Sequence, residues 1–232
     1  MENLVVCEHI CKSFGRKKVL DDFSINIERG KIIGLLGPNG NGKTTLIKIL
    51  AGLLKADSGN VTINGSNVGI DTKNIISYLP ERTYLSPSQK VSDVLTFFND
   101  FYSDFDIEKS KTMLEKLNID INSKIITLSK GTREKVQLAL VMSRNAQLYI
   151  LDEPMGGVDP AARDFIIKTI LSDYNENSSI IISTHLISDI ENILDDVIFL
   201  KEGKINLYAS ADKLRETHKK SVDALFREVF VC

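Results

Sequence analysis

The chain of 232 residues contains no tryptophan and little cysteine. Its three cysteines, Cys7, Cys11 and Cys232, form an odd and widely scattered set. The C-x₃-C spacing of the first two has no second pair of Cys or His downstream, which argues against a zinc site. Reduced thiols in an intracellular protein are therefore the interpretation we adopt.

The sequence also lacks long apolar runs, a leader pattern and an excess of either charge. Stretches such as Ser179–Ser183 have the length of a strand, far below the ~18–20 residues of a membrane-spanning helix. The acidic opening Met1-Glu2-Asn3 does not fit a secretory signal. A formal net charge of -2 gives no bulk attraction to nucleic acid. We expect a soluble intracellular domain without a nucleic-acid partner.

What the sequence does contain is a glycine-rich loop between a predicted strand and a predicted helix. Ile32–Leu36 is an apolar run of strand length, and residues 45–54 have apolar positions at helical spacing. The loop between them, residues 37–45, fits G-x-x-x-x-G-K-[ST] at every position. It consists of Gly37, Pro38, Asn39, Gly40, Asn41, Gly42, Lys43, Thr44 and Thr45. A plain turn rich in Gly and Asn is the weaker alternative.

The residue types of this phosphate loop suit a polyphosphate. Glycines let successive backbone N–H groups turn towards one anion, and the positive N-terminal end of the helix adds to the same site. In this motif Lys43 reaches the β- and γ-phosphates, and the Thr44 hydroxyl ligates Mg²⁺. The sequence therefore predicts a site for a nucleoside triphosphate.

Two other predicted strands end in polar residues that suit the same site. Residues 148–151 are followed by Asp152 and Glu153, and adjacent acids there are costly unless they face a cation or a ligand. We assign Mg²⁺ coordination to Asp152 and polarisation of a water to Glu153. His185 follows Ser179–Ser183, at the strand end where open α/β sheets bind ligands. An acidic turn and a structural histidine are the alternatives.

Two weaker features leave their alternatives open. Ser129 and Gly131 precede a predicted helix, where Ser129 is either an N-cap alone or part of an anion site. Phe14 lies beside Gly15 in a predicted turn, and from the residue alone a core role is favoured over stacking on a purine.

The pattern changes to helix between Val91 and about Asn145. A helical core is the first interpretation of its aromatic residues, and an exposed docking surface is the alternative. Elsewhere, the alternation in residues 19–27 predicts a half-buried antiparallel strand. We therefore predict an α/β fold: a P-loop NTPase core with a parallel sheet, an antiparallel β subdomain and an α-helical subdomain. The expected boundaries are 1–86 with 146–210 for the core and β subdomain, 87–145 for the helical subdomain and 211–232 for a helical tail.

Taken together, these stretches resemble the ATP-binding subunits of ABC transporters, over essentially the whole chain and in the family's order. The phosphate loop looks like the Walker A loop, residues 128–132 like the ABC signature and residues 148–152 like Walker B. The resemblance makes Glu153 the catalytic glutamate and His185 the switch histidine. It adds Asp159 of the D-loop to the nucleotide site, and it gives Phe14 the role of stacking on adenine.

Two departures from the family pattern matter. The signature reads Leu-Ser-Lys-Gly-Thr where Leu-Ser-Gly-Gly-Gln is commonest, so contacts from Ser129 and Gly131 to a γ-phosphate are kept while Lys130 adds a charge. Glu81 stands where the family usually has the glutamine of the Q-loop; it can ligate Mg²⁺, but with a full negative charge. Both variants look like the ATPases of bacterial exporters for drugs and for antimicrobial or amphipathic peptides.

The resemblance also implies a mechanism and partners. Two such domains, identical or related, close head to tail, with each ATP between the phosphate loop of one chain and Ser129 and Gly131 of the other. Glu153 orients or deprotonates the attacking water, Lys43 and Mg²⁺ stabilise charge, and His185 contacts the γ-phosphate. A separate permease subunit completes the transporter at the cytoplasmic face of the cell membrane. Residues 81–84 and 94–105 are its expected docking surface.

Two rival interpretations follow from other classes. A soluble ABC-type ATPase acting on ribosomes or nucleic-acid complexes generally carries two ATPase domains or a long coiled-coil or basic insertion, and this sequence has neither. A regulatory subunit with little hydrolysis is disfavoured by the presence of both Glu153 and His185.

Overall fold

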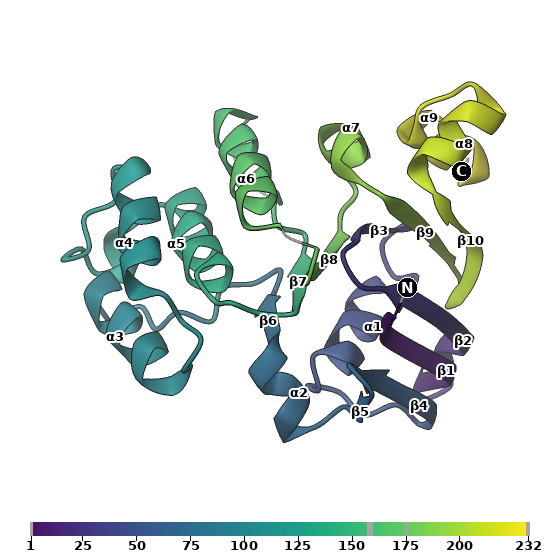
Figure 1. The fold of residues 1–232 in the computed structure, drawn as a ribbon, viewed down its shortest axis with the longest axis horizontal. Coiled ribbons are helices and arrows are strands. Elements are labelled where there is room, and N and C mark those ends of the chain that lie inside the picture. The colour runs from purple at the N-terminus through teal and green to yellow at the C-terminus, as the bar shows by residue number, and fades with distance from the viewer. Residues whose placement is uncertain (1, 157–159, 175, 231–232) are drawn as a thin grey trace.

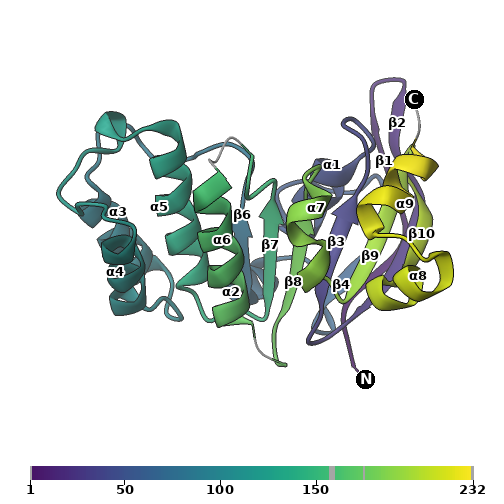
Figure 2. The same cartoon turned by 90° about the horizontal axis from the view of Figure 1, so that it is seen from above.

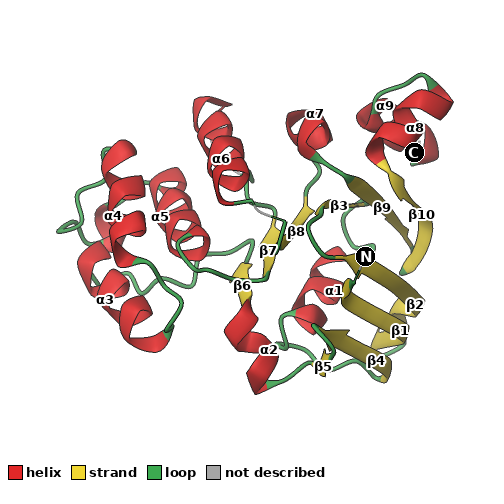
Figure 3. Ribbon diagram, in the orientation of Figure 1, coloured by secondary structure: helices red, strands yellow, loops and turns green. Residues whose placement is uncertain are grey.

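The computed structural model describes residues 2–156, 160–174 and 176–230, and their strands form two sheets (Figures 1 and 3). The described strands are β1 (Asn3–Phe14), β2 (Lys17–Glu28), β3 (Ile32–Leu36), β4 (Ser58–Ile63), β5 (Ser66–Asn67), β6 (Ile76–Leu79), β7 (Leu148–Asp152), β8 (Ser179–Ser183), β9 (Asp196–Lys201) and β10 (Lys204–Ser210). The described helices are α1 (Lys43–Leu50), α2 (Ile70–Ile75), α3 (Val91–Phe101), α4 (Ile107–Lys116), α5 (Lys130–Met142), α6 (Pro160–Asp173), α7 (Ile187–Ile190), α8 (Ala211–His218) and α9 (Val222–Val229), with 3-10 turns η1 (Ile125–Thr127) and η2 (Glu191–Ile193).

The larger sheet has the order β10-β9-β3-β8-β7-β6, and its strands from β9 to β6 run parallel. Every residue of β3, β7 and β8 is buried, as expected for parallel strands covered on both faces. Successive side chains point to opposite faces. In β8, Ile180 and Ile182 therefore pack with α6, α7 and the C-terminal helices, whereas Ile181 packs with α1 and the antiparallel sheet. Figure 2 shows α6, α7, α8 and α9 together over one side of the sheet.

The smaller sheet is antiparallel, with the order β2-β1-β4-β5, which confirms the alternation predicted for residues 19–27. A turn is predicted for residues 12–16, and the turn observed is shorter, because β1 continues to Phe14. Ser13 pairs with Lys18 and Phe14 with Lys17, so that only two residues remain for the turn. Gly15 supplies the left-handed backbone this tight turn needs, with φ 59°.

The helices α3, α4 and α5 gather around a hydrophobic cluster of their own, beyond the edge strand β6 (Figure 1). Val94, Leu95 and Phe98 are buried in it, which confirms a helical core for part of the aromatic stretch. Helix α3 ends at Phe101, whose side chain is 68 % exposed, so the predicted periodicity does not extend to Phe105 within one helix.

Other element bounds differ from the expectation. Helix α1 starts two residues early, at Lys43, and ends at Leu50, since the backbone leaves the helix around Gly52 with φ 67°. Helix α2 and strand β5 were not expected, because residues 66–75 carry too few apolar positions to show a period. The tail folds as two helices rather than one, and Ser221 caps the second.

The C-terminal helix α9 is held by an aromatic cluster on the parallel sheet. The buried ring of Phe199 on β9 lies 5.5 Å from the ring of Phe226 and 5.8 Å from that of Phe230. Such ring pairs add to the free energy of apolar burial, so this cluster fixes the tail to the core.

Replacing Phe199 by Ala is expected to lower the free energy of unfolding by about 3–5 kcal/mol, because the change opens a cavity under α9. Phe97→Ala is the matched control: that ring is 56 % exposed, and its loss should cost less than about 1 kcal/mol. Urea unfolding followed by circular dichroism measures both values. Equal losses in the two variants would contradict the packing described here.

Candidate active site

The carboxyl ends of β3, β7 and β8 meet beside a cavity of about 1030 Å³. This is the edge at which open parallel sheets bind ligands. Its lining comes from the phosphate loop, both sheets and the helical group: Phe14, Lys17, Val19, Asn39, Gly40, Gly42, Lys43, Thr44, Thr45, Glu81, Arg82, Thr83, Lys130, Arg133, Glu134, Glu153, Gly156 and His185. Most of the residues predicted from the sequence therefore share one cavity.

The phosphate loop needs glycine at two positions for different reasons. Gly42 is the N-cap of α1 with φ 105°, and a Cβ there would lie 2.7 Å from the carbonyl oxygen of Val19. A Cβ on Gly37 would lie 2.4 Å from the carbonyl oxygen of Leu200. Neither distance is tolerable for a side chain, so the loop can keep this tight path only with glycine.

Lys43 starts α1 and is 6 % exposed. Its Nζ donates to the carbonyl oxygens of Gly37, at 2.6 Å, and Pro38, at 3.3 Å. Burial lowers the pKa of the Lys43 ammonium, and the negative charges of Glu153 and Asp152 oppose that shift. The cation is thereby held inside its own loop, close to the acids of the site.

Asn41 of the same loop turns away from the cavity. Its Oδ1 accepts from the backbone N–H of Glu202 at 2.6 Å, and its Nδ2 donates to the carbonyl oxygen of Pro38 at 3.2 Å. The side chain thus ties the phosphate loop to the turn between β9 and β10. A contact of Asn41 with a nucleotide therefore stays a prediction for its backbone N–H, because the side chain has structural partners.

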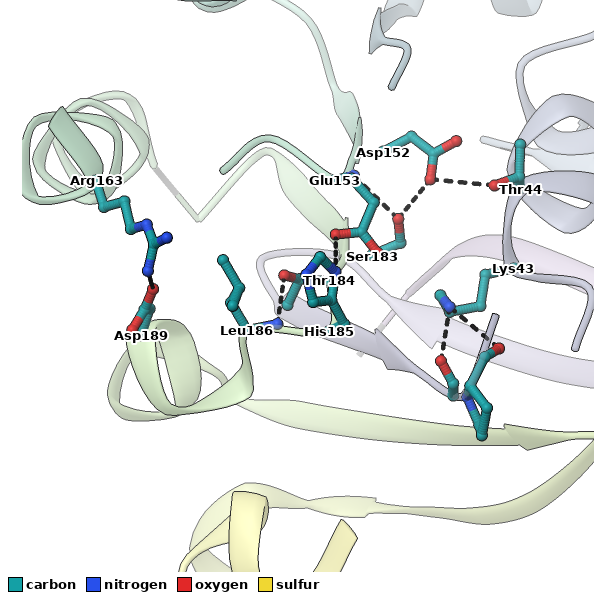
Figure 4. Close-up of polar contacts among 12 residues, drawn as sticks. Lys43, Thr44, Asp152, Glu153, Arg163, Ser183, Thr184, His185, Leu186 and Asp189 are labelled. Atoms are coloured by element: carbon teal, nitrogen blue, oxygen red, sulfur yellow. Dashed lines mark hydrogen bonds and ion pairs between the residues drawn. The ribbon is translucent and has the colours of Figure 1, made fainter. Parts of the chain in front are cut away.

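Asp152 is the most deeply buried acid of the site, at 1 % exposure. Its Oδ1 accepts from the Ser183 hydroxyl at 2.5 Å and lies 3.5 Å from the Thr44 hydroxyl (Figure 4). Its Oδ2 is buried and has no hydrogen-bond partner among the described residues. Burial raises the pKa of the Asp152 carboxyl, and the hydrogen bonds from Ser183 and Thr44 lower it in part.

The unpaired oxygen of Asp152 is a test of whether a metal fits here. A buried carboxylate oxygen without a donor is costly, and a cation beside it removes that cost. The Thr44 hydroxyl lies beside the other oxygen of the same carboxyl group, Oδ1, and Glu81 lines the cavity with a further carboxylate. Carboxylate and hydroxyl oxygens are the donors that Mg²⁺ takes, so these residues fit the ion.

Glu153 and His185 form a pair at the mouth of the cavity. The Glu153 carboxylate oxygen Oε2 lies 2.8 Å from His185 Nδ1, and the two side chains are 13 % and 58 % exposed (Figure 4). The Glu153 backbone is left-handed, with φ 52°, a strained state for this residue type. This kink lets Glu153 leave the line of β7 and turn its carboxylate towards the cavity and His185.

Ser183 links the two acids and was not among the residues we predicted. Besides its bond to Asp152, its carbonyl oxygen accepts from the Glu153 N–H at 3.0 Å, and its hydroxyl oxygen lies 3.2 Å from the same nitrogen. The parallel pairing of β7 with β8 sets Ser183 directly beside Asp152. A hydroxyl at the end of an apolar strand was the available signal.

The helical group lines this cavity with residues that the sequence analysis did not name as site residues. Ser129 caps α5: its hydroxyl accepts from the Thr132 N–H at 3.1 Å and lies 2.8 Å from the Thr132 hydroxyl. Neither Ser129 nor Gly131 lines the cavity, whereas Lys130, Arg133 and Glu134 do. The site prediction for Asp159 lies outside the described residues.

Phe14 is the last residue of β1 and lies at the other end of the cavity. Its ring is 52 % exposed, and the Lys12 ammonium lies 5.6 Å from the ring centroid. Lys17 and Val19 of the facing strand line the same end. An exposed ring face here is open to an aromatic ligand, which fits the stacking role better than a place in the core.

Comparison with known proteins agrees with this geometry. Residues 20–156 match the family described as ABC transporter. The chain belongs to this family. It is 38% identical to an ABC transporter ATP-binding protein of Methanocaldococcus jannaschii, over 92% of this chain and 80% of that protein. It is 30% identical to the SkfA peptide export ATP-binding protein SkfE of Bacillus subtilis, over 97% and 98% of the two chains.

A solved structure, that of an ATP-binding subunit of an ABC transporter, has the same fold. It superposes with a TM-score of 0.88 at 26% identity, covering 97% of this chain and 99% of the other. The protein is therefore the ATP-binding and ATP-hydrolysing subunit of an ABC transporter and works with transmembrane components. A ribosome- or nucleic-acid-directed ATPase is not favoured. Across the described ranges, every helix is too short or too polar to span a membrane.

Replacing Asp152 by Asn is expected to stabilise the nucleotide-free protein at neutral pH. Burial places the folded-state pKa above the unfolded-state pKa, so stability falls as the pH rises through the interval between them. Above the folded-state pKa the whole penalty applies, and below the unfolded-state pKa it is absent. The melting temperature of Asp152→Asn should exceed that of the unchanged chain at neutral pH and converge with it in acid.

Scanning fluorimetry from about pH 4 to about pH 8 measures this convergence of the two melting temperatures. Asp100→Asn is the control, because Asp100 is exposed and its change should give parallel curves. A lower melting temperature for Asp152→Asn than for the unchanged chain at neutral pH would contradict the conclusion that burying the charge of Asp152 lowers stability.

Proposed function

We propose that this ATPase powers export of a drug or an amphipathic peptide through a separate permease subunit, by closure of two ATP-binding chains around ATP. The observation that carries the proposal is the pair formed by Glu153 and His185, held over the buried Asp152 at the mouth of the phosphate-loop cavity. The peptide cargo is supported by the similarity to SkfE and by the signature and Glu81 variants.

In the proposed reaction, this chain's residues position ATP and the water that attacks it. The phosphate loop binds the polyphosphate through its N–H groups, and Lys43 leaves the carbonyl oxygens of its own loop to contact the β- and γ-phosphates. Glu153 accepts a hydrogen bond from the attacking water and orients it. His185 holds the Glu153 carboxylate through Nδ1, and its other ring nitrogen, which has no hydrogen bond to the described residues, contacts the γ-phosphate.

Magnesium would be held by Thr44 and Asp152, with Glu81 on the open side of the cavity. The ion supplies neutralisation of the phosphate charge. Ser183 keeps Asp152 oriented, so that Oδ2 stays available as a ligand. At the far end, Phe14 stacks on the adenine base.

Closure by a second chain, identical or related, is supported by the position of the signature. Ser129 and Gly131 lie outside their own chain's cavity, and a Cβ built on Gly131 meets no atom within 4 Å. No contact with the described residues therefore requires glycine at that position. We assign Ser129 and Gly131 to the ATP of the partner chain, together with Asp159.

The permease is proposed to dock on the exposed rings beside the helical group, at the cytoplasmic face of the membrane. Tyr84, Phe97 and Phe101 are 48 %, 56 % and 68 % exposed. The rings of Phe97 and Phe101 stack at a centroid distance of 5.7 Å, and Tyr84 stacks on Phe98 at 6.5 Å. A contiguous exposed aromatic surface of this kind is typical of a protein-binding site.

Glu153→Gln is expected to bind ATP but not turn it over, because the amide keeps the shape of the side chain and loses the base. Size-exclusion chromatography with light scattering should show a monomer alone and a dimer with Mg²⁺-ATP. ADP provides the control and should leave the monomer. Ordinary turnover by the variant would remove Glu153 from its proposed role.

Gly131→Asp should abolish this ATP-dependent dimer while the monomer stays folded. The site is open, and an acid in the first turn of α5 is favourable by about 0.3–1 kcal/mol, so the melting temperature should not fall. In the closed dimer the same carboxylate would face the partner's phosphates. Binding of a fluorescent ATP analogue to the monomer is the control, and a dimer of normal affinity would exclude Gly131 from the contact.

Phe101→Glu is expected to reduce transport by about tenfold or more without changing ATP affinity, because a carboxylate is costly in an apolar interface. Transport into inside-out vesicles that contain the permease measures the first quantity, and ATP titration of the isolated chain the second. Phe101→Leu keeps an apolar side chain and should retain most transport. Full transport by Phe101→Glu would place the docking surface elsewhere.

A further inference from the structure

A buried arginine joins the helical group to the parallel sheet. Arg144 lies two residues beyond the end of α5 and is 4 % exposed. The helical group packs around one hydrophobic cluster, and Leu138, Val141 and Met142 of α5 also pack into the cluster of the parallel sheet. This apolar packing holds α5 against the sheet but has little directional preference, so the polar contacts at this connection contribute to the angle between the two parts.

On the sheet side, Arg144 binds the backbone where α2 passes into β6. Its Nη1 donates to the carbonyl oxygen of Ile76 at 2.6 Å, and its Nη2 to that of Asn74 at 2.8 Å. The second of these is one of the carbonyl groups that the C-terminal end of a helix leaves without an internal partner. A cation at that end is also favoured by the helix dipole.

On the side of the helical group, the same guanidinium binds the connection between α3 and α4. Nε and Nη2 each donate to one carboxylate oxygen of Asp104, both at 3.0 Å. The guanidinium carbon lies 4.0 Å from the centroid of the Tyr102 ring, a cation–π contact. The Asp104 carbonyl oxygen also accepts from the N–H of Asn145 at 2.9 Å.

Only arginine can make this set of contacts. Its planar fork offers N–H groups in fixed directions, which here serve one carboxylate and two carbonyl groups at once while one face covers a ring. A lysine ammonium has no such fork and no flat face. We call these five residues, Asn74, Ile76, Tyr102, Asp104 and Arg144, the joint.

Two segments, β6 with the residues after it and α5, run between the joint and the active site. The joint lies at the end of each segment that is farther from the active site. Strand β6 starts in the joint at Ile76 and leads into Glu81, and α5 ends beside the joint and begins with Lys130 of the signature. A change of angle at the joint therefore moves the signature relative to the phosphate loop, with the length of α5 as the lever arm.

We infer that Arg144 is a positioning residue: by fixing the angle of α5 on the sheet, it sets where Ser129 and Gly131 are presented to the ATP of a partner chain. The inference rests on the proposed function for the partner, but the joint itself lies within one chain. Arg144 touches neither the cavity nor the phosphate loop, so it governs association and not the binding of ATP to the monomer.

The first test measures the angle without any nucleotide. A pair of distance labels is introduced through noncanonical amino acids in place of Glu115, on α4, and Lys213, on α8, which are both exposed. In the chain with Arg144 the distance distribution should be narrow, and Arg144→Lys should broaden it or shift its mean. Leu114→Ala, in the helical core away from the joint, is the control for a general loss of stability and should keep the narrow distribution.

The second test measures association of the same variants in the Glu153→Gln background. Arg144→Lys should raise the protein concentration needed for half dimerisation with Mg²⁺-ATP by about tenfold or more, with the monomer's ATP affinity within about twofold. Leu114→Ala should leave both values within about twofold. Tyr102→Phe keeps the ring beneath the guanidinium and should behave like the unchanged chain.

Each outcome bears on a different statement. An unchanged distance distribution in Arg144→Lys would overturn the positioning role, whatever the dimer does. Equal losses of association in Arg144→Lys and Leu114→Ala would show that Arg144 affects association only through overall stability, which would overturn its positioning role. Failure of the Glu153→Gln parent to dimerise, with a broadened distribution in Arg144→Lys, would overturn ATP-driven closure and leave the joint in place.

Discussion

The active site depends on one carboxylate kept inside a parallel sheet. Asp152 occupies the last position of a buried strand, where one of its oxygens is bound to Ser183 and the other has no partner in the described part of the chain. Burial opposes its charge, as the direction of its pKa shift indicates. The apolar strands around it supply the stability that tolerates this state, and they fix the position of the oxygen that we propose as a metal ligand before any nucleotide arrives.

From that carboxylate the remaining geometry follows through the parallel register. Pairing of β7 with β8 sets Ser183 beside Asp152, and pairing of β8 with β3 brings the phosphate loop to the same edge. Glu153 then leaves the strand through its left-handed backbone and meets His185. The groups that we propose to bind phosphate and those that we propose to act in hydrolysis thus follow different strands of one sheet, while the signature belongs to the helical group.

The parts of the site that the sequence could predict are those encoded by local patterns. The phosphate loop is contiguous, and the acids and His185 directly follow apolar runs, so strand ends and ligands could be assigned together. Ser183 was not predicted as a site residue, because its role arises from pairing with a strand 31 residues away. The contacts of Arg144 were not predicted for the same reason, since its partners Asp104 and Ile76 lie 40 and 68 residues from it. Such contacts depend on tertiary packing and leave no local period.

The fold shows the same division. Apolar runs predicted β3, β7 and β8 well, because complete burial selects continuous apolar residues. The turn predicted for residues 12–16 was too long, since the polar end of a hairpin that faces solvent resembles a loop. Helix α2 carries no apolar stripe, and its end is satisfied by a side chain from elsewhere, so nothing within residues 66–75 revealed it.

The left-handed backbone at Glu153 bears on how this protein can change over evolutionary time. That conformation costs a residue with a long side chain about 1 kcal/mol, and Gly or Asn would adopt it more readily. In the proposed reaction, orientation of the attacking water is what requires an acid there. A descendant that no longer hydrolyses ATP, but still binds it, would gain backbone stability from a change to Gly or Asn at position 153 while its phosphate loop stayed unchanged. If Glu153 has the proposed role, such a change removes catalysis and relieves backbone strain in one step.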